Sequence, residues 1–150
     1  MSVRMGGVAM AAPAGWETRL RRQPAGSPGL PGNMLLHAAT TAIPADRGDF
    51  GSGAVEMLGP DDVFVSLLEY DRVEAGSTLF AAQGVPTVRP SEFSPTGMQR
   101  PLPGQSGGQW FFTAADRPYC LFVVLGSHAR RTALAVRVNA LLRTLQLGPS

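Results

Sequence analysis

The chain has 150 residues and a formal net charge of +2, a length that suits one domain with a sizeable core and is short for two. Hydrophobic residues make up 44% of the chain and charged residues only 16%, compared with about 25% in an average domain, which excludes a chain that is disordered throughout. All 13 basic residues are arginine, which stays charged far above neutral pH, and they do not gather with aromatic residues on one face, so the high isoelectric point does not indicate a nucleic-acid partner.

The N-terminal region predicts short strands. Ser2–Met5 and Val8–Ala11 flank Gly6-Gly7, a dipeptide that can adopt the positive φ angles of a two-residue hairpin turn. Trp16 to Arg22 alternates apolar with charged residues, which suits an edge strand whose charges discourage pairing with other chains. Asn33 to Ala39 has an apolar centre and is predicted as a further strand.

The middle of the chain predicts one central strand and one long loop. Val63 to Tyr70 is almost continuously apolar, as expected of a strand that is covered on both faces. Ala81 to Gly108 contains five prolines and five glycines and is predicted as a loop. Long loops in compact domains are often functional, so we expect a binding surface here. Its candidate binding residues are Phe93, Met98, Leu102 and Ser106.

The last third predicts two strands and a helix. Gln109–Ala114 and Pro118–Leu125 are rich in aromatic and β-branched residues and flank the short break Ala115-Asp116-Arg117, which predicts a hairpin. From Ser127, whose hydroxyl can cap the first turn, an amphipathic helix is expected to run to Gly148. The predicted core-facing stripe of this helix consists of Leu134, Val138, Leu141, Leu142 and Leu145.

Together these elements predict the α+β class. We expect a single antiparallel sheet with the C-terminal amphipathic helix packed on it. The prediction is one α+β domain over residues 1–150, with the long loop at about 81–108.

The opening of the chain resembles a known type of domain. Pro13-Ala14-Gly15-Trp16-Glu17, after a short strand, resembles the Pro-x-Gly-Trp start of small PsbP-like α/β/α sandwich domains. Gly59 to Val65 and Gln109 to Phe112 are similar to segments of uncharacterised actinobacterial proteins of this kind. The resemblance implies a PsbP-like sandwich and a non-catalytic module that binds other proteins, without naming a partner.

One motif in the loop has the pattern of a catalytic serine. Gly104 to Gly108 matches Gly-x-Ser-x-Gly, in which Ser106 would be the nucleophile. A nucleophile elbow needs a strand before it and a helix after it, whereas here a proline-rich loop precedes and a strand follows. We therefore predict no catalytic residue. Gly48 to Gly53 lacks the lysine of a phosphate-binding loop and is interpreted as a glycine-rich turn.

Metal and cofactor binding are not expected. The chain has two histidines, His37 and His128, which lie far apart in sequence from each other and from Cys120. Cys120 is the only cysteine and lies within an apolar strand, where a thiol behaves as a small hydrophobe. The absence of a disulfide, of a convincing signal peptide and of a long apolar segment leads us to expect a cytoplasmic protein without a transmembrane span.

Two functional hypotheses follow from the sequence. The first is a non-enzymatic protein-binding or assembly module that uses the loop Ala81 to Gly108 and the sheet face beside it. The alternative is a small-molecule-binding domain or a hydrolase with a site under the same loop. The alternative requires Ser106 to meet His37 or an aspartate within hydrogen-bond reach.

Overall fold

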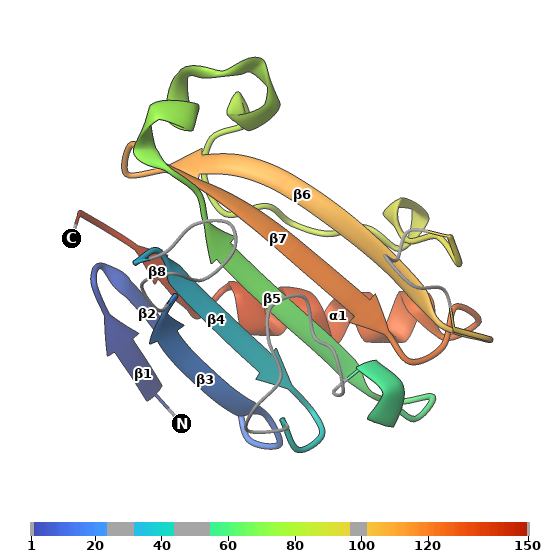
Figure 1. The fold of residues 1–150 in the computed structure, drawn as a ribbon. Coiled ribbons are helices and arrows are strands. Elements are labelled where there is room, and N and C mark those ends of the chain that lie inside the picture. The colour runs from blue at the N-terminus through green and yellow to red at the C-terminus, as the bar shows by residue number, and fades with distance from the viewer. Residues whose placement is uncertain (1, 24–31, 44–54, 97–101, 150) are drawn as a thin grey trace.

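The fold contains eight strands, one α-helix and four short 3-10 helices, as described by a computed structural model for residues 2–23, 32–43, 55–96 and 102–149 (Figure 1). The strands and the α-helix are β1 (Ser2–Met5), β2 (Val8–Ala11), β3 (Glu17–Arg22), β4 (Met34–Ala39), β5 (Val63–Glu69), β6 (Ser106–Ala114), β7 (Arg117–Leu125), α1 (Arg131–Leu142) and β8 (Leu145–Leu147). The 3-10 helices are η1 (Val55–Met57), η2 (Arg72–Gly76), η3 (Thr78–Phe80) and η4 (Pro90–Glu92).

The strands form two antiparallel sheets. The larger has the order β3-β4-β5-β7-β6, and the smaller has the order β1-β2-β8. The α+β class is therefore confirmed, and the prediction of a single sheet is wrong. The second sheet exists because β8 pairs with the N-terminal hairpin, with Val8 opposite Leu147 and Met10 opposite Leu145.

The predicted helix is too long at its C-terminal end. α1 ends at Leu142, where the N–H and the hydroxyl of Thr144 donate to the carbonyl of Leu141 at 3.0 and 2.8 Å. Leu145 is buried and Gln146 is exposed, an alternation that fits a strand. The helix also begins later than predicted: the hydroxyl of Ser127 accepts the N–H of Arg130 at 3.3 Å, one turn before the helix starts.

The central strand of the larger sheet is β5, as predicted. All seven of its residues are buried. Val65 and Leu67 face a core that includes residues of the small sheet and of α1, and α1 lies behind the larger sheet in Figure 1. Phe64 faces the other side, where Val55 and Leu58 pack on a smaller apolar cluster. Within the described residues, the only α-helix thus covers one face of the larger sheet.

The hairpin of β6 and β7 is confirmed, with a two-residue turn at Ala115 and Asp116. β6 begins at Ser106, so the predicted loop loses its last residues to the strand. Part of the remaining loop follows the outer edge of β6. Ser94 exchanges backbone hydrogen bonds with Gly107 at 3.0 and 2.9 Å, and Gln83 forms a parallel bridge with Thr113. The described helices include none long and apolar enough to cross a membrane.

Candidate functional site

Ser106, the first residue of β6, contacts a histidine. Its Oγ lies 2.8 Å from Nδ1 of His128. The contact forms because strand pairing places Ser106 opposite Leu125, at the end of β7, and the chain then turns towards α1 through His128. The N–H of His128 donates to the carbonyl of Gly104 at 2.7 Å, which fixes the turn against the start of β6.

This serine–histidine contact is closed to a substrate. Ser106 is 0% exposed, and no carboxylate of the described residues contacts the ring of His128 to orient it as a general base. His37 does not take part, because its ring lies on the opposite face of the larger sheet, 5.2 Å from the ring of Phe64. We therefore interpret the contact between Ser106 and His128 as a tether between β6 and the turn before α1.

Replacing Ser106 with alanine is expected to lower the free energy of unfolding by about 1 kcal/mol, because the hydroxyl bond to His128 is lost inside the fold. A fluorophosphonate probe is expected to leave Ser106 of the folded wild type unlabelled, since its Oγ is inaccessible. Urea unfolding and peptide mass spectrometry measure the two results. Ser91→Ala, at an exposed position, is the control for stability, and an adduct on Ser106 in the folded protein would contradict the tether.

The candidate binding residues of the loop have different environments. Phe93 is 4% exposed, and its ring packs edge-on against Trp110 with the centroids 5.3 Å apart. Leu102 is half-buried and Ser106 is buried, while Met98 lies outside the described residues. Phe93 and Ser106 therefore lie inside the fold, where Phe93 fixes the loop to β6. The binding role of these four residues stays a prediction.

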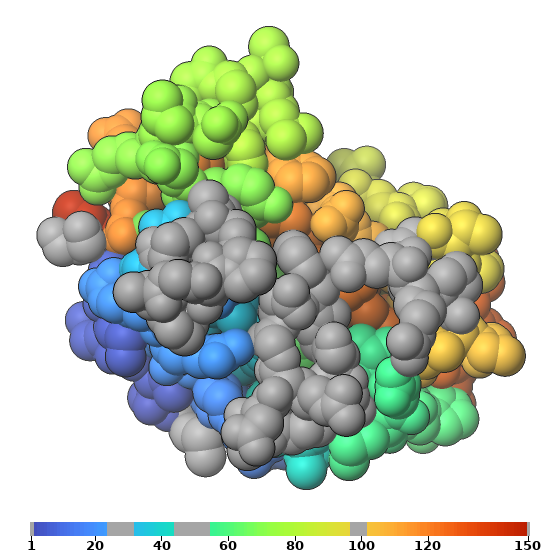
Figure 2. Space-filling model, in the orientation of Figure 1, coloured from blue at the N-terminus to red at the C-terminus, as the bar shows by residue number. Residues whose placement is uncertain are grey.

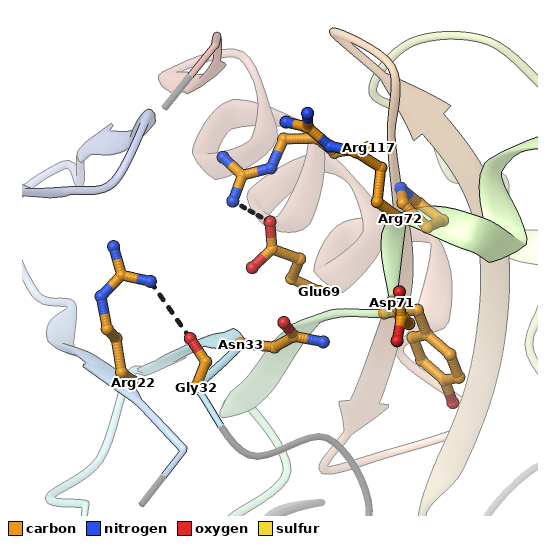
Figure 3. A pocket seen from close by; sticks show the side chains of 9 residues that line it. Arg22, Gly32, Asn33, Glu69, Asp71, Arg72 and Arg117 are labelled. Carbon is orange, nitrogen blue, oxygen red and sulfur yellow. Dashed lines mark hydrogen bonds and ion pairs between the residues drawn. The ribbon is translucent and has the colours of Figure 1, made fainter.

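A polar pocket of about 250 Å³ lies at the other end of β7 from the serine–histidine contact (Figure 3). Strand β3, the end of β5, η2 and the start of β7 meet there, and each contributes charged side chains. The pocket is lined by Arg22, Gly32, Asn33, Glu69, Tyr70, Asp71, Arg72, Arg117 and Pro118.

A buried ion pair between Glu69 and Arg117 forms the inner wall of this pocket. The side chains of both residues are almost fully buried, and their charged groups are in direct contact. The other carboxylate oxygen of Glu69 accepts the N–H of Met34 at 3.0 Å. Nη1 of Arg117 donates to the carbonyl of Gly6 at 2.8 Å, in the turn between β1 and β2. The pair thus links the two sheets, and its two opposite charges neutralise each other.

The outer part of the pocket carries two exposed arginines. Nη1 of Arg22 donates to the carbonyl of Gly32 at 3.1 Å, and no carboxylate of the described residues pairs with Arg22 or Arg72. Asp71 is engaged at the start of η2, where its Oδ1 accepts the N–H of Val73 at 3.3 Å. The pocket therefore presents two guanidinium groups that form no ion pair with any carboxylate of the described residues.

Cys120 and Asp62, which the sequence also suggested for chemistry, make structural contacts. Cys120 is 0% exposed, and burial raises the pKa of its thiol to about 11, although a long contact from the amide of Gln109 opposes this. The thiol is therefore uncharged at neutral pH and behaves as a small hydrophobe. Asp62 accepts bonds from Thr40 and from the N–H of Gly59 at 2.8 and 2.9 Å, which fixes the turn before β5. Gly48 to Gly53 lies outside the described residues.

Comparison of the chain with known protein families, curated proteins and solved structures finds no match. The contacts within the molecule therefore carry the functional argument. Sequence reasoning missed the polar pocket because its charged residues are spread from Arg22 to Arg117. One signal was present: Glu69 ends an otherwise apolar, buried strand, and a buried carboxylate requires a partner.

Proposed function

We propose that this chain is a non-enzymatic protein-binding or assembly module. The observation that carries the proposal is the exposure of apolar side chains on η2 and η3. We call this segment, residues 72–80, the corner. Val73 is 79% exposed and Leu79 is 55% exposed. Figure 2 shows this corner, in green, projecting from the top of the molecule.

The corner is fixed to the sheet by one aromatic anchor. Phe80, at the end of η3, is 1% exposed, and its ring lies 5.2 Å from that of Tyr70 and 5.6 Å from that of Phe111. The hydroxyl of Thr113 donates to the carbonyl of Phe80 at 2.7 Å. The exposed residues therefore stand on a segment that is bonded to β6 and packed against the sheet.

This combination favours binding to another protein. An exposed valine or leucine adds little to the stability of the fold. Burying it in an apolar hollow of a partner contributes about 25 cal/mol to the binding free energy for each Å² removed from water. Because Phe80 fixes the end of η3 to the sheet, the segment that carries Leu79 loses less conformational entropy when a partner binds it. We therefore propose a protein partner with an apolar hollow that accepts these two side chains.

The proposed surface differs from the one predicted from the sequence. Leu79 lies just before the predicted loop, and Phe93 in that loop is packed against Trp110. The resemblance of Pro13 to Glu17 to PsbP-like domains supports the same functional class, since that resemblance implies a protein-binding module. A PsbP-like sandwich is part of the proposal on that ground alone.

Affinity capture from native lysate tests the proposal. Tagged wild type is compared with the double variant Val73→Ser/Leu79→Ser, and bound proteins are quantified by mass spectrometry. We expect a specific partner on the wild type and a reduction of roughly tenfold on the double variant, equivalent to about 1.4 kcal/mol. Both substitutions are at exposed positions, so each should change folding stability by no more than about 0.5 kcal/mol.

Val136→Ser is the matched control. Val136 is an apolar residue of α1 that is 64% exposed, and it lies outside the corner. This variant should retain the partner at the wild-type level. Equal capture by all three proteins, or no specific capture by the folded wild type, would contradict the proposed surface.

A further inference from the structure

The polar pocket described above combines a net positive charge of its described lining residues with a volume of about 250 Å³. Among the described residues, three arginines and two carboxylates line it, and the Glu69–Arg117 pair accounts for one charge of each sign. Arg22 and Arg72 remain, and Asp71 is the only other carboxylate among the lining residues that the structure describes. The described lining residues therefore carry a net positive charge, and this charge does not involve Val73 or Leu79, although Arg72 belongs to η2 of the corner.

The two remaining arginines line the same pocket from different elements. Arg22 comes from β3 and Arg72 from η2, and Figure 3 shows them on different sides of the pocket, with the Glu69–Arg117 pair between them and Asn33 below that pair. A guanidinium group matches a carboxylate in shape and can donate two parallel hydrogen bonds to it. The side-chain amide of Asn33 lines the same space and supplies a neutral donor.

The acidic residues of the pocket are bonded to groups other than Arg22 and Arg72. Glu69 is 4% exposed, and its two oxygens are occupied by Arg117 and by the N–H of Met34. Asp71 is exposed but uses Oδ1 in the cap of η2. Neither carboxylate pairs with Arg22 or Arg72 in the structure.

The volume limits what can bind. About 250 Å³ is slightly below the range of about 300–1,000 Å³ that is typical of pockets for drug-sized ligands. This volume is enough to hold a small carboxylate. We infer that the pocket between Arg22 and Arg72 binds the carboxylate group of a small molecule, with Asn33 as an additional donor.

Titration of the isotope-labelled full chain with succinate tests this inference by NMR. We expect saturable shifts of the Nε–H signals of Arg22 and Arg72 and of the side-chain amide of Asn33. Arg22→Gln and Arg72→Gln should each weaken binding by roughly tenfold, which corresponds to about 1.4 kcal/mol. Raising the NaCl concentration should weaken binding to the wild type, since the arginines are exposed to solvent.

Arg89→Gln is the matched control, because Arg89 is an exposed arginine outside the pocket. It should bind succinate as the wild type does. A second titration with N-acetyl-glutamate amide distinguishes two sources of the carboxylate. Tighter binding of succinate supports a free small molecule, whereas tighter binding of the glutamate derivative indicates a side chain of a partner and contradicts the small-molecule ligand. Shifts that do not saturate, or an equal loss of affinity in Arg89→Gln, would overturn the inference.

Discussion

Replacing Arg117 with methionine is expected to lower the free energy of unfolding by about 3–5 kcal/mol, because the carboxylate of Glu69 is then left buried without its partner. The same substitution removes the bond from Nη1 of Arg117 to the carbonyl of Gly6, which links the larger sheet to the β1–β2 turn. Urea unfolding followed by circular dichroism measures the loss. With a typical urea dependence of about 1–3 kcal/mol per M, the midpoint should fall by about 1 M or more.

The double variant Glu69→Leu/Arg117→Met separates the ion pair from the volume that it fills. With both charges removed, we expect much of the lost stability to return, since no unpaired charge remains in the interior. Arg72→Met, at an exposed position in the same pocket, is the control and should change stability by no more than about 0.5 kcal/mol. If Arg117→Met is as stable as Arg72→Met, the buried pair does not contribute as described.

Replacing Gly126 with alanine is expected to lower the free energy of unfolding by about 3 kcal/mol. A Cβ atom at this position would collide with the carbonyl oxygen of Gly59 and lie 2.8 Å from its carbonyl carbon. Both obstacles are backbone atoms, which cannot move aside by changing a rotamer. The N–H of Gly126 also donates to the carbonyl of Asp62 at 2.8 Å, so a shift of the chain would break a backbone bond.

Gly76→Ala is the matched control for this steric effect. A Cβ at Gly76 meets nothing within 4 Å, and Gly76 is not among the glycines with positive φ. Its stability should therefore stay near that of the wild type or rise slightly, as expected when an unstrained glycine is replaced. Thermal and urea unfolding of both variants give the comparison. Equal stability of Gly126→Ala and Gly76→Ala would show that the close approach at Gly126 is not required.

Most of the strands could be predicted because their patterns are local. The glycine pair between β1 and β2 and the apolar run of β5 each indicate one structure without reference to the rest of the chain. The end of α1 could not be predicted in this way. Leu141, Leu142 and Leu145 continue a helical stripe, yet Leu145 and Leu147 also alternate as in a strand. Pairing with β2 decides between the two, and that contact is long-range.

The candidate sites depend on long-range contacts to a greater degree. Ser106 and His128 are 22 residues apart, and only the pairing of β6 with β7 brings them within 2.8 Å. The polar pocket contains both Arg22 and Arg72, which are separated in the sequence by β4, η1 and β5. Residue type and spacing cannot show such proximity before the strand order is known. The exposed position of Val73 likewise follows from the turn that places η2 outside the sheet.

The small sheet has a consequence for the order in which the chain folds. β2 lies between β1, which precedes it directly, and β8, which follows it by more than 130 residues. On the ribosome, the N-terminal hairpin would be complete long before Leu145–Leu147 is synthesised, so one edge of β2 must wait for its partner. Closing contacts over such sequence separations slows folding, because chain entropy is lost before the contact is gained. We therefore expect the docking of β8 to be a late step, with the edge of β2 open to other strands until it occurs.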